Sequence, residues 1–108
     1  MREIKFRAWD KQLDRYWYSD DINTEFIGEI IQGIHTYIVL EQYTGLKDKN
    51  GVEIYEGDIV QDENQFVFDV KWQMLGYDGD NIGFNIKAYE TIEVIGNIYE
   101  NPELLNKD

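Results

Sequence analysis

The sequence predicts a mainly β protein: a small, partly open barrel of the SH3-like kind, with an N-terminal β-hairpin and a short C-terminal helical turn. Three observations support this fold class. Several short segments alternate between apolar and polar residues, which is typical of strands with one buried face. Asn50-Gly51 is a strong signal for a tight hairpin turn. The run Gly57-Asp58-Ile59-Val60 leads from a bend into an apolar strand, and the barrel is inferred by analogy from that entry.

The length and composition suit one soluble domain. The chain has 108 residues, which fits a single domain over residues 1–108, and 43% of them are hydrophobic. The absence of Cys excludes disulfides and thiolate metal sites. No apolar run is long enough to span a bilayer, and the first residues lack the apolar core of a signal peptide. We therefore expect a cytoplasmic protein that has no membrane partner.

The charge is large and unevenly distributed. The net charge is −12, yet residues 1–15 hold five bases and only three acids. Residues 16–46 and 51–70 contain no Lys or Arg. An acidic surface repels the phosphates of nucleic acids and of anionic lipids. The composition thus argues against binding to duplex nucleic acid.

The N-terminal segment alternates over residues 3–9. This pattern predicts a half-buried strand, with Phe6 and Ala8 on one face and Lys5, Arg7 and Trp9 on the other. A polar loop at 10–14 and an aromatic strand at 15–18 complete the predicted hairpin.

Residues 23–33 are compatible with a helix or a strand. Apolar residues recur at helical spacing, Asn23 or Thr24 could cap the start, and Gly33 could end the helix. The β-branched content and Gly28 favour a strand instead. We favour a short helix, followed by a strand from His35 into Gln42.

The central segment, residues 42–60, predicts a strand, a turn, a second strand, a tight bend and a third strand. We expect Gly51 to have a positive φ, because a primed or bulged turn requires it there. Asp48 can bond to the backbone amides of this turn, and Asp58 can cap the bend after Gly57.

The C-terminal half predicts more strands and one helical turn. Strands are expected at 65–72, 83–88 and 91–98, with a turn-rich loop at 76–81. In the first of these, Phe66, Phe68 and Val70 share a face. Asn101 is placed as an N-cap, with Pro102 at the first helical position.

Three blocks of the chain resemble the YopX family of phage and prophage proteins. They are residues 2–10, residues 42–60 with their Gln-Tyr-Thr-Gly and Glu-Gly-Asp-Ile-Val runs, and residues 94–105. The blocks follow the family's order and span the chain. Arg15 to Tyr18 and Glu41 depart from the pattern, which often has Lys-x-Met and Met at these places. The resemblance implies a small, mainly β protein of phage origin in a bacterial host, and it implies no reaction.

The sequence offers little catalytic chemistry. His35 and Ser19 are the sole histidine and serine, and neither stands in a nucleophile motif. Asp78-Gly79-Asp80 begins like a calcium loop, but Ile82 occupies the next ligand position. Glu56 and Asp58 could act as paired carboxylates, although a bend explains them equally well. We therefore predict no enzyme, no cofactor and no metal.

Aromatic residues are the remaining functional lead. The predicted interaction surface comprises Lys5, Arg7, Trp9, Trp17, Tyr43 and Tyr55. Such residues suit a protein interface, with another protein or with a second copy as partner. They also suit a weak single-stranded nucleic-acid platform, on which bases stack beside Lys5 and Arg7. A non-enzymatic interaction protein is the leading hypothesis. Single-strand binding is the second, and a carboxylate enzyme is the third.

Overall fold

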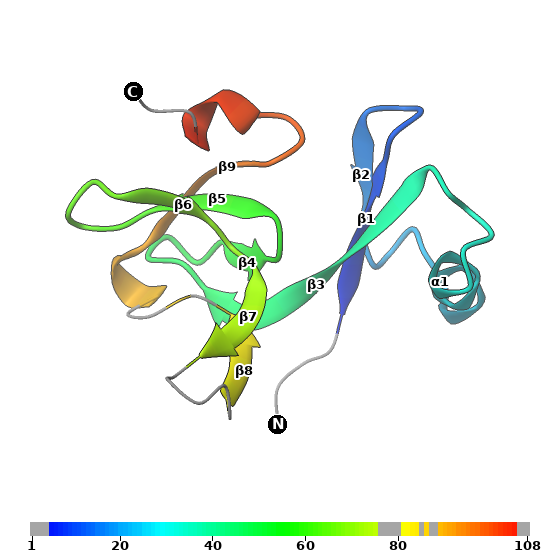
Figure 1. Ribbon diagram of the computed structural model, residues 1–108, viewed down its shortest axis with the longest axis horizontal. Coiled ribbons are helices and arrows are strands. Elements are labelled where there is room, and N and C mark those ends of the chain that lie inside the picture. Colours follow the sequence, from blue (N-terminus) through cyan, green and yellow to red (C-terminus); the bar gives the residue numbers. More distant parts are fainter. Residues whose placement is uncertain (1–4, 76–80, 85, 87–88, 106–108) are drawn as a thin grey trace. The chain divides into compact units, whose positions relative to one another are not determined.

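The computed structural model describes residues 5–75, 81–84, 86 and 89–105 (Figure 1). The chain divides into two compact units, Met1–Tyr43 and Thr44–Asp108, and each is described by itself. The elements in chain order are β1 (Phe6–Asp10), β2 (Arg15–Trp17), α1 (Thr24–Ile31), β3 (Ile38–Lys47), β4 (Glu53–Tyr55), β5 (Asp58–Gln61), β6 (Val67–Asp69), β7 (Trp72–Leu75), β8 (Asn81–Phe84), the 3-10 turn η1 (Tyr89–Thr91), β9 (Glu93–Asn97) and the 3-10 turn η2 (Pro102–Leu105). The predicted fold class is confirmed: the protein is mainly β, with a curled half-barrel sheet, a second sheet and a short C-terminal 3-10 turn.

In the N-terminal unit, β1 lies between β2 and the first part of β3, and both pairings are antiparallel. The register places Trp9 opposite Tyr16 and Arg7 opposite Glu41. The predicted strand is confirmed at Phe6–Asp10, but it is not half-buried, because both faces of β1 are covered. Ala8 is fully buried on one face, and Arg7 and Trp9 are buried on the other.

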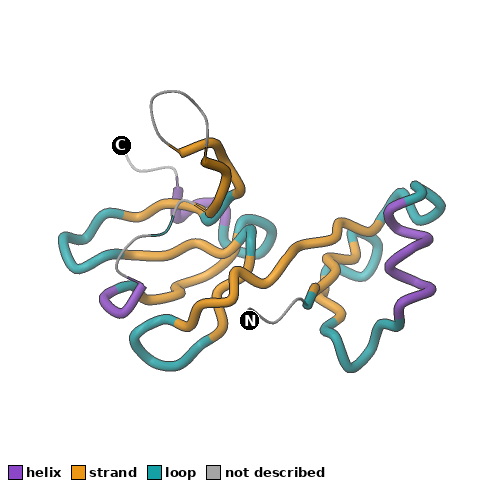
Figure 2. Tube along the Cα trace, turned by 90° about the horizontal axis from the view of Figure 1, so that it is seen from below, coloured by secondary structure: helices purple, strands orange, loops and turns teal. Residues whose placement is uncertain are grey.

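The helical reading of residues 23–33 is confirmed. The Asn23 side chain accepts a 2.8 Å hydrogen bond from the backbone N–H of Phe26, as an N-cap does. At the other end Gly33 has φ +82°, and its N–H donates to the carbonyl of Ile30. The N–H of Ile34 donates to the carbonyl of Glu29, which completes a Schellman motif. Local capping therefore outweighs the β-branched content of α1 (purple in Figure 2).

The strand predicted from His35 begins later than expected. β3 starts at Ile38, whose N–H donates to the carbonyl of His35 in a turn. That turn bond occupies the carbonyl of His35, and the strand pairing to β1 starts only after it.

The C-terminal unit is built around β5, which pairs with β6 on one side and β9 on the other. Its core is aliphatic. The fully buried members are Ile54, Val60, Val70 and Ile92, with Leu46, Phe68, Ile86 and Val94 packed against them. A register shift between Ile59 and Val60 bends β5 along β9, which sequence periodicity did not predict.

The predicted turn at Asn50-Gly51 is confirmed as a bulged hairpin. Gly51 has φ +82°, its N–H donates to the carbonyl of Asp48, and the Asp48 N–H donates to the carbonyl of Val52. One carboxylate oxygen of Asp48 also accepts hydrogen bonds from the N–H groups of Asn50 and Val52. The expectation that Asp48 sets the turn is therefore correct.

A second turn of the same construction follows β5. Asp62 accepts from the N–H groups of Asn64 and Phe66, and its own N–H donates to the carbonyl of Phe66. Gln65 occupies the position of Gly51, with φ +71°. The two turns share the pattern Asp-x-Asn, and the polar, acidic composition of residues 61–64 also predicts a turn there.

The bend at Gly57 is also as predicted. Gly57 has φ +90°, and the carboxylate of Asp58 accepts a 2.8 Å hydrogen bond from the backbone N–H of Tyr55. Asp58 is buried in this role. The carboxylate therefore fixes the passage from β4 to β5.

Two predictions in the C-terminal half need correction. The single strand at 65–72 is wrong: β6 ends at Asp69, and β7 begins at Trp72. Val70 itself lies at the bend before β5: its N–H donates to the carbonyl of Asp58, and its carbonyl accepts from the N–H of Gly57. β6 also begins only at Val67. Phe66 is therefore outside the strand and 68% exposed, while Val70 is buried.

The helical turn at the C-terminus starts at Pro102, as expected, but Asn101 does not cap it with its side chain. Instead its Oδ1 accepts from the N–H of Asn97 and lies against Gly96.

The strand predicted at 91–98 is β9, preceded by η1. Of the other expected segments, residues 76–80 of the loop, including Asp78-Gly79-Asp80, lie outside the described residues, as do 85, 87 and 88 of the strand at 83–88.

Candidate functional site

The predicted interaction surface is mostly interior. Arg7, Trp9, Tyr43 and Tyr55 are only 4–5% exposed, so they cannot form the surface that the sequence suggested. Lys5 and Trp17 are partly exposed. The structure brings Lys5 over the ring of Tyr43, with 4.9 Å between Nζ and the ring centroid.

The reason for the burial of Arg7 is a charge pair with Glu41. The Arg7 Nε donates to Glu41 Oε1 at 2.9 Å, and both side chains are almost fully enclosed. The guanidinium also lies 4.1 Å from the ring centroid of Tyr16, which in turn contacts the rings of Trp9 and Tyr18. A charge is tolerated in the interior when it is paired and hydrogen-bonded, and Glu41 meets that need.

Asp10 anchors the hairpin loop of the same unit. Its Oδ1 accepts from the N–H groups of Gln12 and Leu13, and its Oδ2 accepts from the indole Nε1–H of Trp17 at 3.1 Å. Desolvation acts to raise the pKa of Asp10, but these hydrogen bonds and the nearby Arg15 outweigh it and leave the pKa below its usual value. The carboxylate thus fixes the geometry of the loop.

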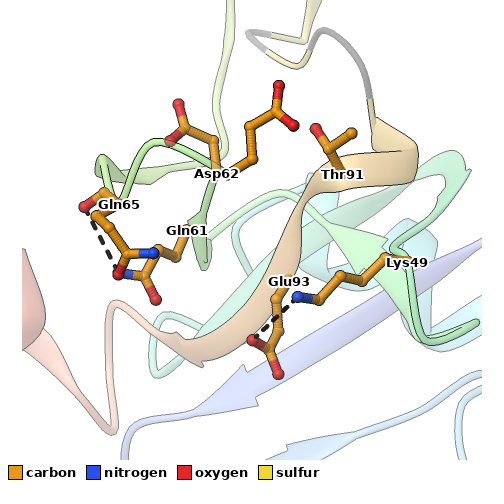
Figure 3. Close-up of a pocket in the computed structure, with 7 residues that line it drawn as sticks. Lys49, Gln61, Asp62, Gln65, Thr91 and Glu93 are labelled. Atoms are coloured by element: carbon orange, nitrogen blue, oxygen red, sulfur yellow. Dashed lines mark hydrogen bonds and ion pairs between the residues drawn. The ribbon is translucent and has the colours of Figure 1, made fainter.

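A polar cavity of about 410 Å³ lies in the C-terminal unit (Figure 3). It is lined by Lys49 from the first bulged turn, by residues of the second bulged turn, and by Thr91 and Glu93. Lys49 Nζ lies 3.9 Å from Glu93 Oε1, and the Gln61 side chain donates to Gln65. Its wall therefore consists of polar groups that bind one another.

A second cavity, of about 280 Å³, lies in the N-terminal unit and is here named the helix cleft. Its lining residues are Trp17, Asp21, Ile22, Asn23 and Phe26. Trp17 comes from β2, and the others surround the start of α1. The cleft combines apolar walls with the exposed carboxylate of Asp21.

The helix beside this cleft is unusually apolar for its exposure. Phe26, Ile27, Ile30 and Ile31 form one stripe, since residues three and four positions apart lie on the same side of a helix. No residue of α1 is buried, and Ile31 is 72% exposed. This stripe and the helix cleft together are named the α1 surface.

A third exposed feature is the tip of the first hairpin, residues 11–15. All five side chains are exposed, and Leu13 is 59% exposed between the bases Lys11 and Arg15. Asp14, within this tip, has φ +52°. Arg15 lies 4.1 Å from the ring centroid of Trp17, which it partly covers.

Sequence reasoning named the N-terminal hairpin and Trp17, but it missed Leu13 and the apolar stripe of α1 as functional candidates. Two signals could have found them. Leu13 is an isolated apolar residue in an otherwise polar loop, and four of the eight residues of α1 are large and apolar.

Neither metal binding nor a membrane span finds support in the described part of the chain. Within residues 5–75, 81–84, 86 and 89–105, no three acidic or histidine side chains group as a metal site. Among those same residues, no helix is both long and apolar enough to cross a bilayer.

The fold and these surfaces define a small, mainly β protein of two compact units. Over residues 5–106 the chain matches the family described as YopX protein, and it belongs to that family. The chain is also similar to the crystal structure of protein EF1440 from Enterococcus faecalis, with 25% identity and a TM-score of 0.56. The similarity covers 98% of this chain and all of that one. No curated protein matches the sequence.

Proposed function

We propose that this YopX-family protein is a non-enzymatic accessory protein of phage or prophage type, which acts in the cytoplasm of a bacterial host by binding another protein or a second copy of itself. The contact is made by the α1 surface. The observation that carries the proposal is that no residue of α1 is buried, although half of its eight residues are Phe or Ile. Ile31 is 72% exposed, and Phe26, Ile27 and Ile30 are half-buried. Apolar surface that remains in contact with water marks interaction sites, because covering it is favourable.

The charge around α1 defines the chemistry of the partner. Asp20, Asp21 and Glu25 are exposed near the start of the helix, and no Lys or Arg occurs anywhere in residues 16–46. An apolar stripe beside uncompensated acids favours a protein segment that carries an apolar side chain flanked by Lys or Arg. An acidic or a purely polar segment does not match this surface.

The competing functions receive less support from the geometry. His35 Nε2 lies 2.8 Å from Glu29 Oε1, its ring packs on Phe26, and it lines neither of the two cavities described above. The single-strand hypothesis requires Trp9 and Arg7 to meet a base, and both are buried. Burial of the stacking face argues against that role.

The proposal can be tested with a defined probe. A synthetic peptide in which Leu alternates with Lys is titrated into ¹⁵N-labelled protein, and amide shifts are mapped. We expect shifts at residues 17–34, and none with a matched peptide that carries Glu in place of Lys. Ile31→Ser should weaken binding, whereas Phe66→Ser, which changes an exposed apolar residue of the other unit, should not. Shifts confined to residues 44–105, or equal binding of both peptides, would contradict the proposal.

A further inference from the structure

The N-terminal unit contains both halves of a complementary contact. We infer that two copies of this chain associate about a two-fold axis, each placing Leu13 of its hairpin tip in the helix cleft of the other. This inference rests on the proposed function, since it names the partner of the α1 surface. The partner segment required there, an apolar side chain between two bases, is present in the chain itself as Lys11 to Arg15.

Charge complementarity is the first argument. Residues 16–43 of the unit carry five acids and no Lys or Arg. Of the bases in the first hairpin, Arg7 is buried against Glu41, whereas Lys11 and Arg15 are exposed at the tip. Two exposed bases of the unit therefore lie at the tip, and Asp21 places negative charge on the cleft. Opposite patches on one surface attract a second copy, and the attraction sets the orientation of approach.

The apolar parts also match. Leu13 is 59% exposed, so it does not occupy the cleft of its own copy. The cleft of about 280 Å³ has Ile22, Phe26 and the indole of Trp17 as apolar walls, and it is larger than a Leu side chain. Seating Leu13 there removes apolar surface from water on both sides of the contact.

The topology allows the contact to be reciprocal. β2 stands at the end of the strand order β2-β1-β3-β4, so one of its sides has no neighbouring strand in that order. When two copies of β2 lie antiparallel about an axis near Tyr16, residue 13 of each falls opposite residue 19 of the other. The cleft residues Asp21 and Ile22 come two and three positions after residue 19 in the chain, so they lie close to Leu13 of the other copy in this arrangement. A two-fold contact of this kind closes on itself and yields a dimer, with no open chain.

Sedimentation equilibrium over about 1 µM to 1 mM tests the inference, and this range covers weak dimers. Twice the protomer mass of 12.9 kDa is expected at the upper end of the range. Leu13→Ser should weaken association about 100-fold, because burial of one Leu changes an equilibrium constant about tenfold or more and the dimer contains two such contacts. Phe66→Ser serves as the matched control and should leave association unchanged.

Charge reversal at Lys11 and Asp21 tests the proposed contact independently of its apolar area. Lys11→Glu and Asp21→Lys should each weaken the dimer, and the double variant should recover it. A wild-type monomer at the highest concentration, an unaffected Leu13→Ser dimer, or no recovery in the double variant would each overturn the inference.

The Leu–Lys peptide, titrated into Leu13→Ser, separates the two proposals. If it binds while the wild type stays monomeric, only the self-association fails. If it does not bind, the proposed function fails as well.

Discussion

The carboxylate of Asp48 accepts a 2.9 Å hydrogen bond from the backbone N–H of Val94, 46 residues further along the chain. Its other oxygen holds the N–H groups of Asn50 and Val52, so one buried side chain joins the first bulged turn to β9. The neighbouring N–H of Lys49 donates to the carbonyl of Ile92 and strengthens the same junction. The first bulged turn is therefore a tertiary contact with β9 as well as a local turn.

Asp48→Ala should destabilise the C-terminal unit by about 2–4 kcal/mol, because it removes the acceptor of three backbone N–H groups, those of Asn50, Val52 and Val94. Asp62→Ala is the matched control, since Asp62 makes the same two turn bonds in an exposed setting. We expect it to cost about 1 kcal/mol. Urea denaturation followed by far-UV circular dichroism measures both changes. Equal losses in the two variants would show that the bond to Val94 contributes nothing.

The two bulged turns predict opposite responses to substitution at their positive-φ positions. Gly51→Val should cost roughly 1–3 kcal/mol, because a β-branched residue resists this region. Gln65→Gly should stabilise by up to about 1 kcal/mol, because glycine relieves the strain at φ +71°. Thermal unfolding of the two variants and the wild type measures both stability changes. The same sign of change for both would be incompatible with the shared geometry.

Local signals explain what the sequence predicts well. The cap at Asn23, Gly33 at the C-terminus of α1, the turn at Gly51 and the bend at Gly57 each depend on a few adjacent residues. Their conformations follow from side-chain hydrogen bonds and from glycine's freedom.

Contacts between distant segments explain the failures. In the sequence Arg7 has the pattern of an exposed base. In the fold it is buried, because the β1–β3 pairing places it opposite Glu41, 34 residues away, with which it forms an ion pair. Alternation places Trp9 on the polar face of a strand whose two faces are both covered. The importance of Leu13 depends on where its loop lies relative to other surfaces, and alternation patterns carry no such information.

Asp10 predicts a pH dependence of the N-terminal unit. Its pKa is lower in the folded protein than the ordinary value of 3.8, so the stabilisation is present above that value and is lost as the pH falls through the folded pKa. We expect the denaturation midpoint of the wild type to fall more steeply below about pH 4 than that of Asp10→Asn. Indole fluorescence reports it, because Trp17 donates to Asp10. Asp14→Asn, in the same loop, should follow the wild type, and parallel curves for all three proteins would contradict this role.

The charge distribution predicts no useful affinity for duplex DNA near physiological salt. A net charge of −12 opposes the phosphates, and one of the five bases in residues 1–15, Arg7, is already buried against Glu41. Fluorescence anisotropy with a labelled duplex measures this. Submicromolar binding at that salt would displace protein binding as the leading function.

The most direct test of the account is the position of one hairpin tip on another copy. The chain has no Cys, so Gln12→Cys carries a single spin label at the exposed tip. Spin-labelled protein at natural ¹⁴N abundance is mixed with ¹⁵N protein that carries no spin label. Only the amides of the ¹⁵N copies are observed, so any broadening reports contacts between copies. The account predicts broadening at residues 17–26, around the helix cleft, and its loss when both copies carry Leu13→Ser. Broadening that is absent, or that is centred on residues 44–105, would contradict it.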